Sequence, residues 1–394
     1  MKSRVLSFAS LASSLARSQT QAVIDQVQDD RPRLTCQLNV LPSPVAAEHK
    51  SDEVFVAMSH DEVQFLEQTL LTEQARLFVV EAADMVLPLP EGLAILCVPN
   101  RVAPFDAYLN RQGLIMDEMD PGSKVGVMSV RSRSQMNGMW PDLDFQILRG
   151  GIDKAMETHM RRSEIDGLII PAAVTEHLGI QGIVAEIFAP EFVLPSPGQG
   201  ILAIVGRSAD CEAREMLSGL HSEDSAVELA TEQAFCSRMI SDQDLPVGAL
   251  AKVENGEVCI VGATGTGANR VVINGKVSEA EAVGSGLAQQ ILCSGESFAD
   301  LLEAEFPDGL PDDPEESAVI DEDAEILDDF NYEESDETEG SQTAQGSGRL
   351  DELAQLDDLD HMKDLENMAG IEEAPKAGAN SDDALEDDED ESYD

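Results

Sequence analysis

A chain of 394 residues, of which 42% are hydrophobic, is long enough for two or three domains with buried cores. Its formal charge of −52 excludes the basic face that nucleic-acid binding needs, and no apolar run reaches the roughly 18 residues of a membrane-spanning helix. The charge is uneven, because 38 of the 77 acidic residues but only 3 of the 25 basic ones follow Cys293. We therefore expect an acidic body near about −17 and a tail near about −35.

The six cysteines contain no Cys-x-x-Cys pair, and the six histidines are equally dispersed. This pattern favours buried thiols in a reducing cytoplasm over a zinc site, so we predict a cytoplasmic protein without a metal. The first 21 residues are rich in Ser and Arg and free of acid, as in an organelle transit peptide. The same stretch has a strand pattern at 5–9 and a helical pattern at 13–27, and we favour this second interpretation.

Residues 1–98 alternate short apolar runs with amphipathic stretches. Strands are predicted at 4–9, 36–42, 76–82 and 93–99, and helices at 13–27 and 60–72. The prolines and the lack of periodicity predict a loop at 42–51. Such alternation is typical of an α/β layer with largely parallel strands.

A second α/β pattern follows, with strands predicted at 124–130, 144–149 and 166–171 and helices between and after them, including 151–162 and 172–178. A crossover rich in Pro and Gly, Leu194–Gly200, leads to one more strand at 200–207. Two α/β units with a late crossover indicate two domains that flank a cleft. Such clefts are the usual place for small-molecule sites.

Residues 221–294 predict an α+β domain with a helix at 226–240, strands at 246–254, 257–263 and 270–274, and a closing helix at 279–293. Asn-Gly pairs at 255–256 and 274–275 predict tight turns. From residue 295 onward Asp and Glu dominate, which predicts a disordered tail. Leucines at 350, 353, 356 and 359 have near-helical spacing, so this segment either folds on a protein partner or stays solvated.

Charged side chains follow several predicted strands. Asp84 comes after the strand at 76–82, and Arg131, Arg133 and Arg149 follow strand ends in the second unit. Side chains at the carboxyl ends of strands point toward the crevice where α/β domains bind ligands, and arginine pairs with carboxylates in a bidentate manner. These residues indicate a cleft for an anionic small molecule, with helix capping and a solvated surface as the alternative.

The glycine-rich stretch Gly262–Arg270 has two interpretations. Its glycines are typical of a loop that binds phosphate through backbone N–H groups. It lacks the Gly-Lys-Ser/Thr ending of such loops and has predicted strands on both sides, so we favour a hairpin connection.

Eight short motifs stand in a fixed order between residues 3 and 293: LARSQT, LPEGL, KVGVMSVRSRSQ, PDLDFQILRGG, IDGLIIPAA, LPSPGQGILAI, EQAF and LPVGA. No single motif is specific, but the order and spacing of the set resemble those of the porphobilinogen deaminase (hydroxymethylbilane synthase) family. That family consists of transferases of tetrapyrrole and haem synthesis. They join four porphobilinogen units, with release of ammonia, on a dipyrromethane cofactor held by a cysteine thioether.

The resemblance implies a fold of two α/β domains like those of type-II periplasmic binding proteins, flanking a cleft, and a small α+β third domain. We assign 1–98 with 198–220 to domain 1, 99–197 to domain 2, 221–294 to domain 3 and 295–394 to the disordered acidic tail. The resemblance further implies anionic pyrroles as small-molecule partners. We expect a monomer with no nucleic-acid or membrane partner and a protein partner for the tail.

Several residues match the functional positions of that family. By resemblance Asp84 is the catalytic aspartate, which binds pyrrole N–H groups and stabilises the cationic intermediate. Ser13, Ser129, Arg131 and Arg149 fall on positions that contact substrate or cofactor, and Arg133 lies next to another.

Other positions depart from the family. Uncharged or weakly basic residues replace family cations at Leu11, Ala83, Ser132, Ala155 and His177, and Glu62-x-Gln64-Phe65 replaces a Phe-x-Lys-Glu stretch. Gln243 stands at the position of the cysteine that anchors the cofactor, and glutamine cannot form a thioether. Cys236, about two helical turns earlier, is a candidate substitute, but we interpret it as a packed helix thiol.

Two hypotheses follow. Either the chain retains hydroxymethylbilane synthase activity through Asp84, or it is an inactive relative that binds tetrapyrrole precursors or a protein partner. The missing anchor, the lost cations and the added tail favour the second. The acidic excess, with six lysines against sixteen arginines before residue 294, also suits a high-salt cytoplasm.

Overall fold

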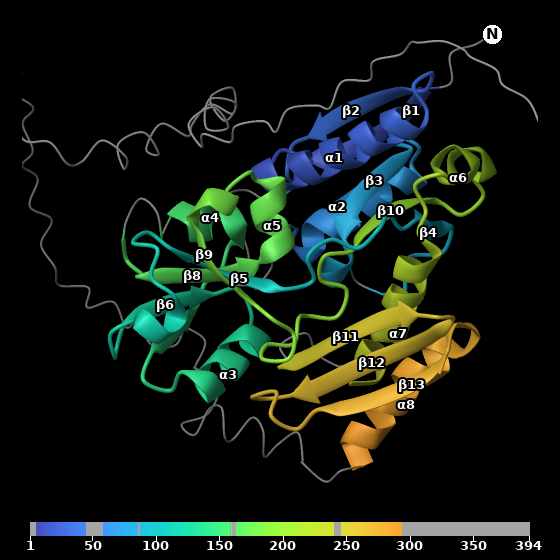
Figure 1. Ribbon diagram of the computed structural model, residues 1–394. Coiled ribbons are helices and arrows are strands. Elements are labelled where there is room, and N and C mark those ends of the chain that lie inside the picture. The colour runs from blue at the N-terminus through green and yellow to red at the C-terminus, as the bar shows by residue number, and fades with distance from the viewer. Residues whose placement is uncertain are drawn as a thin grey trace, which may run out of the picture. The chain divides into compact units, whose positions relative to one another are not determined.

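The computed structural model describes residues 5–44, 58–85, 87–157, 159, 163–239 and 246–293. Within these ranges the chain forms two α/β domains with five-stranded sheets and a small α+β domain with a three-stranded sheet (Figure 1). This confirms the predicted fold class for the described residues. The predicted tail and its leucine-rich segment lie outside the described residues.

Domain 1 has a sheet of order β2-β1-β3-β10-β4. Its strands are β1 (Val5–Leu11), β2 (Thr35–Leu41), β3 (Leu77–Glu81), β4 (Leu93–Cys97) and β10 (Leu202–Arg207). Its helices are α1 (Ser14–Asp30), α2 (His60–Leu71), the 3₁₀ turn η2 (Ala82–Asp84) and α6 (Cys211–Leu217). Alternate residues of the central strands enter two buried clusters, one shared with α2 and the other with α6. The sheet is therefore covered on both faces, as expected of an α/β layer.

Local sequence signals define where α1 and α2 begin. The hydroxyl of Ser13 accepts the backbone N–H of Ala16 and so caps α1. Ser59 and Glu62 form a reciprocal capping box at the start of α2. The predicted strand and helix near the N-terminus are thus confirmed as β1 and α1, and the helix predicted at 60–72 is confirmed as α2.

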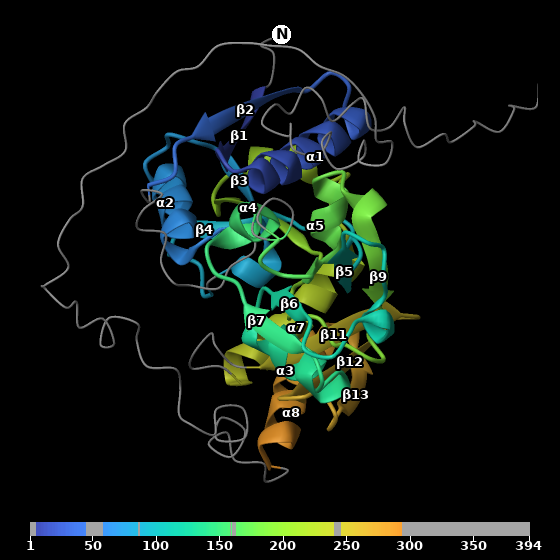
Figure 2. The same cartoon turned by 90° about the vertical axis from the view of Figure 1, so that its left-hand side faces the viewer.

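Domain 2 has a sheet of order β7-β6-β8-β5-β9. Its strands are β5 (Asp106–Asn110), β6 (Lys124–Val127), β7 (Asp144–Ile147), β8 (Gly167–Pro171) and β9 (Val184–Phe188). Its helices are α3 (Val130–Met139), α4 (Gly151–Met156) and α5 (Ala172–His177), with 3₁₀ turns η3 (Met116–Glu118) and η5 (Gln181–Ile183). Figure 2 shows α3, α4 and α5 around this sheet.

The expectation of largely parallel strands was only partly correct. β1 pairs in parallel with β2 and β3, and β6 pairs in parallel with β7 and β8. β10 is inserted between β3 and β4 and runs antiparallel to both, and β5 runs antiparallel to β8 and β9. The physical reason is that β10 enters domain 1 from the crossover rather than from a βαβ unit.

Domain 3 packs α7 (Glu223–Met239) and α8 (Ala280–Cys293) against one sheet, with the 3₁₀ turn η6 (Val277–Glu279) before α8. Its strands are β11 (Val247–Glu254), β12 (Glu257–Thr264) and β13 (Val271–Lys276), all antiparallel. The turn at Asn255-Gly256 is confirmed, since both residues have positive φ. The turn predicted at 274–275 was wrong, because Asn274 and Gly275 pair with Cys259 and Val258 inside the sheet.

The glycine-rich stretch joins β12 to β13, as the hairpin interpretation predicted. A Cβ at Gly267 would lie 3.0 Å from the side-chain oxygen of Gln135, and one at Gly138 would lie 3.0 Å from Cβ of Thr266. The loop therefore packs closely against α3 of domain 2. Among the described helices none combines the length and apolar composition needed to cross a membrane.

Candidate functional site

Asp84 ends the short turn η2, which directly follows the buried strand β3. Its side chain is half-buried. The turn is fixed by the crossover, since Ala82 N–H donates to the carbonyl of Ile201 at 2.8 Å. Gly198, with φ of +83°, lies against the same backbone, where a Cβ would come within 2.9 Å of the Ala82 carbonyl carbon. The crossover therefore positions the residue expected to be catalytic.

Glu81 lies just before this turn and is 2% exposed. Its carboxylate accepts Gly200 N–H and the Gln19 side-chain amide, both at 3.0 Å. Burial raises the pKa of Glu81, while these hydrogen bonds and the charge of Arg101 oppose the rise. The sequence prediction missed this residue, although a lone acid at the end of an apolar strand is a recognisable signal.

The predicted site residues gather at two sheet edges. Ser13 and Asp84 follow β1 and β3, which pair in parallel in domain 1. Ser129 and Arg149 follow β6 and β7, which pair in parallel in domain 2 with Val127 opposite Ile147. Carboxyl ends of parallel strands meet at one edge, so the structure brings together the members of each pair.

The two serines serve as helix N-caps. Ser13 accepts Ala16 N–H at 3.3 Å, and Ser129 accepts Ser132 N–H at 3.0 Å. Both are half-buried. Their hydroxyl protons remain available to donate to a ligand, because an N-cap uses only the oxygen lone pair.

Arg131 is buried and paired within the protein, whereas an arginine that binds ligand carboxylates is expected to face the cleft. It is 5% exposed, and Nη2 lies 2.8 Å from Oδ2 of Asp106. Nη1 donates to the carbonyl of Leu194 at 2.6 Å, and Nε to the hydroxyl of Ser196 at 3.1 Å. All three guanidinium nitrogens thus have protein acceptors.

The remaining predicted arginines differ from one another. Arg149 is exposed and makes no hydrogen bond or ion pair with any residue that the structure describes. Arg133 is half-buried on α3. Of the two, Arg149 is the better placed to meet a ligand from solution.

The positions at which the resemblance implies family cations are largely apolar here. Leu11 and Ala155 are each 1% exposed and belong to one buried apolar cluster. Ser132 is 3% exposed, and its hydroxyl has no hydrogen-bond partner. Burial lowers the pKa of His177, which favours its neutral form. None of these four residues supplies a permanent positive charge.

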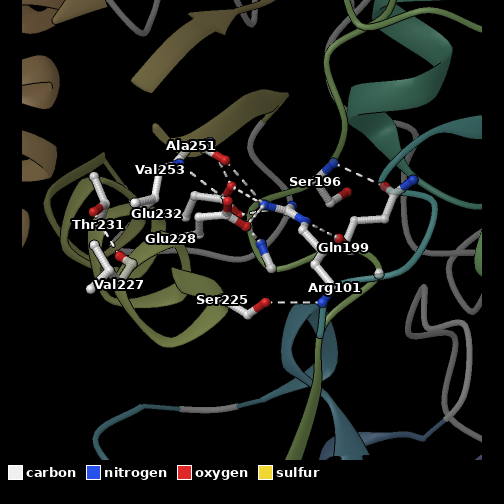
Figure 3. Close-up of polar contacts among 12 residues, drawn as sticks. Arg101, Ser196, Gln199, Ser225, Val227, Glu228, Thr231, Glu232, Ala251 and Val253 are labelled. Carbon is white, nitrogen blue, oxygen red and sulfur yellow. Dashed lines mark hydrogen bonds and ion pairs between the residues drawn. The ribbon is translucent and has the colours of Figure 1, made fainter. Parts of the chain in front are cut away.

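A buried ion pair joins the three domains at the base of the crossover (Figure 3). Arg101 donates to Glu232 through Nη1 at 2.6 Å and Nη2 at 3.2 Å, and Glu228 lies 3.7 Å from Nη1. Glu232 is fully buried and also accepts Gly198 N–H at 2.6 Å and Ala251 N–H at 2.7 Å. A single carboxylate of α7 thereby holds the crossover and the first strand of domain 3.

Gln243 belongs to the segment 240–245, which lies outside the described residues. Cys236 is described and lies half-buried on α7. Burial, aided by the charge of Glu232, raises the pKa of the Cys236 thiol to about 11. A thiol with this pKa is almost entirely protonated at neutral pH and is a poor nucleophile.

Among the described residues, Cys236, Arg131 and the matched apolar positions do not fit a covalently bound dipyrromethane. Such a cofactor needs a reactive thiol and several cations for its carboxylates. The described residues offer a protonated helix thiol at Cys236, an arginine already paired at Arg131, and buried apolar side chains at Leu11 and Ala155. Within the same residues no three His, Cys, Asp or Glu side chains are arranged to hold a metal ion.

Comparison with known proteins finds one family in both the family models and the curated relatives. Residues 6–215 match the family model described as "Porphobilinogen deaminase, dipyromethane cofactor binding domain". The porphobilinogen deaminase of Thermus thermophilus is 30% identical over 299 residues, covering 74% of this chain and 97% of that protein. Those of a Roseiflexus species and of Brevibacillus brevis are each 29% identical, over 72% of this chain and 94% and 92% of their own length.

Among solved structures, the methionine-binding protein MetQ shares 14% identity with this chain at a TM-score of 0.33, over 55% of this chain and 89% of its own. A match this distant supports no inference about function. The family model and the relatives, by contrast, extend over more than half of the chain. The chain therefore belongs to the porphobilinogen deaminase family.

Proposed function

We propose that this chain is a porphobilinogen deaminase-family protein that binds pyrrole precursors of tetrapyrroles without polymerising them. The proposal is supported by Gln243, which stands where the resemblance places the anchor cysteine, and by Cys236, the thiol nearest to it in the sequence, whose pKa is raised to about 11. Without a thioether the growing chain has no covalent primer. Binding of single precursors does not need one.

The electrostatics support the same proposal. A charge-assisted hydrogen bond contributes about 1.5–3 kcal/mol. Loss of about four such bonds would remove roughly 6–12 kcal/mol of ligand binding, an upper figure because such effects are not additive. The engagement of Arg131 by Asp106 removes one more cation from the ligand. A polyanionic product is also repelled by a body with a charge of about −17.

The residues that remain are suited to hold one pyrrole. Asp84, half-buried at the end of η2, is placed to accept pyrrole N–H groups. Ser13 and Ser129 keep hydroxyl protons to donate, and Arg149 is exposed for one carboxylate. In this proposal Asp84 orients the ring through its N–H group, while Arg149 and the serines orient its acidic side chains.

The alternative is that hydroxymethylbilane synthase activity is retained. Its support is the placement of Asp84, on a turn fixed by both Gly198 and Ile201 in the way that a catalytic group requires. Under this alternative another residue must carry the dipyrromethane, with Cys236 as the first candidate.

Intact-mass analysis of the purified chain, with a porphobilinogen-consumption assay on the same sample, separates these functions. We expect an unmodified mass and no consumption. A dipyrromethane adduct with loss of porphobilinogen would overturn the proposal, and peptide mapping would identify the residue that carries it. Cys236→Ser is the matched variant, since an adduct on that thiol would disappear from it. Gln243→Cys tests whether an added anchor thiol is sufficient to acquire the adduct.

We further propose that the protein is a cytoplasmic monomer whose acidic tail binds a protein partner. The support is compositional: dispersed free cysteines, no membrane-spanning helix among the described residues, and a concentration of acidic residues after residue 294. Size-exclusion chromatography with light scattering tests the monomer directly, and a single peak near 42.4 kDa is expected.

A further inference from the structure

Domains 1 and 2 meet along a seam between α1 and the helices α4 and α5. α1 packs directly against α5, and both views of the fold place these helices side by side (Figures 1 and 2). One buried apolar cluster contains residues from both sides of the seam: Leu11, Leu15 and Ala16 from domain 1, and Ile152, Ala155, Ala172 and Val174 from domain 2. Two of these, Leu11 and Ala155, are positions where the family carries cations.

Two hydroxyls on one face of α1 hold this seam by hydrogen bonds. Ser14 Oγ donates to Oδ1 of Asp153 on α4 at 2.5 Å, and Ser18 Oγ donates to the carbonyl of His177 at the end of α5. Residues four apart in a helix share a face, so Ser14 and Ser18 form one contact surface. The protein's own groups thus join the two domains next to Ser13, which the resemblance assigns to ligand contact.

Asp153 stands out among these groups because it brings a negative charge. Its side chain is exposed and contacts the first residue of α1, adjacent to Ser13, which is expected to contact the ligand. A carboxylate of a ligand that approaches Ser13 must displace Asp153 from Ser14 or accept a like charge beside it. The segment also carries two exposed cations, Lys154, which directly follows Asp153, and Arg149, which precedes it by four residues.

We propose that Asp153 is a specificity-determining residue: it takes the place of a ligand carboxylate at Ser14, holds the seam closed without a ligand, and selects against pyrroles with several carboxylates. This inference rests on the proposed function only for the class of ligand. The seam itself is a property of the ligand-free protein and is tested without any ligand.

The first test measures amide hydrogen exchange of residues 14–20 in the ligand-free chain. Ser14→Ala and Asp153→Ala remove the hydrogen bond and are expected to raise exchange there about two- to tenfold, which corresponds to one net hydrogen bond. Asp153→Asn keeps an acceptor and should leave exchange close to wild type. Asp120→Ala is the matched control, because Asp120 is an exposed aspartate of domain 2 whose side chain makes no hydrogen bond or ion pair to a described residue.

The second test measures the Kd of porphobilinogen by calorimetry. Asp153→Asn and Asp153→Ala should both lower the Kd by about fivefold or more, the effect of removing one like charge about 4 Å away in water. Asp120→Asn changes the net charge equally and should change the Kd by less than about twofold, because salt screens distant charges.

Three results would overturn the inference. Exchange in residues 14–20 that is the same in Asp153→Ala and wild type would show that no seam is held by this contact. An equal gain in affinity in Asp153→Asn and Asp120→Asn would show only a general charge effect. Absence of porphobilinogen binding in every Asp153 variant, with binding retained in the wild-type chain, would refute the specificity role. The proposed function fails on a different result, a covalent adduct with consumption in the wild-type chain.

Discussion

Arg131 and Asp106 form a buried ion pair, with Nη2 of the arginine 2.8 Å from Oδ2 of the aspartate. The other oxygen of Asp106 accepts the side-chain amide of Gln199, and the other nitrogens of Arg131 donate to Leu194 and Ser196. Three of these partners belong to the crossover segment 194–199. The pair therefore joins α3 and β5 of domain 2 to the crossover.

This arrangement predicts that Arg131 contributes mainly to stability. Arg131→Ala leaves Asp106 as a buried, unpaired charge, which should lower the free energy of unfolding by about 3–5 kcal/mol. Arg149→Ala is the matched control, since Arg149 is exposed, and it should change the free energy by less than about 0.5 kcal/mol. Urea denaturation of both variants measures the difference. Wild-type stability in Arg131→Ala together with weaker porphobilinogen binding would instead identify Arg131 as a ligand residue.

Glu232 should be equally important for the junction of the three domains. Glu232→Gln keeps the size of the side chain but removes the charge opposite Arg101 and turns an amide donor toward groups that donate themselves. We expect a loss of about 3–5 kcal/mol of unfolding free energy. Glu223→Gln, on the same helix with an 89% exposed side chain, should be near neutral. Similar denaturation midpoints for the two variants would contradict this account.

Local patterns in the sequence were sufficient to predict most of the fold. The period of apolar residues located β1, α1, α2, β6 and β8, because each buries one regular face or a continuous apolar run. The local patterns did not reveal β5, whose five buried residues begin with Asp106 and end with Asn110. A strand with polar ends resembles a loop unless the partners of those ends are known.

For the site, too, the local features could be predicted from the sequence and the long-range contacts could not. The position of Asp84 after a strand and the serines before two helices follow from local sequence. The internal pairing of Arg131 does not, since Asp106 is 25 residues away and Leu194 is 63 residues away in the chain. The contact of Ser14 with Asp153, across 139 residues, depends in the same way on how the domains pack.

Gly198 should be required for the position of Asp84. Both Gly198 and Gly122 have positive φ, +83° and +84°, so alanine at either costs about 1–2 kcal/mol in backbone strain. At Gly122 a Cβ meets nothing within 4 Å, whereas at Gly198 it would overlap the backbone of Ala82 and Ala83. We expect Gly198→Ala to lose a further 1–3 kcal/mol or so of unfolding free energy in urea denaturation. Equal losses would show that the crossover does not fix this turn.

The thiol of Cys236 should be resistant to alkylation, which bears directly on whether it can anchor a cofactor. Its pKa is raised to about 11, roughly two units above an ordinary thiol, so the reactive thiolate is roughly a hundredfold scarcer at pH 8. Cys211 is exposed and serves as the internal reference. Treatment of the native chain with iodoacetamide at pH 8, followed by peptide mass spectrometry over time, should show Cys236 reacting at least about tenfold more slowly than Cys211.

In urea both thiols should react at similar rates, because unfolding removes the burial that raises the pKa of Cys236. Equal rates in the native chain would mean that Cys236 is accessible as a thiolate, and it would then have to be reconsidered as the anchor of a dipyrromethane.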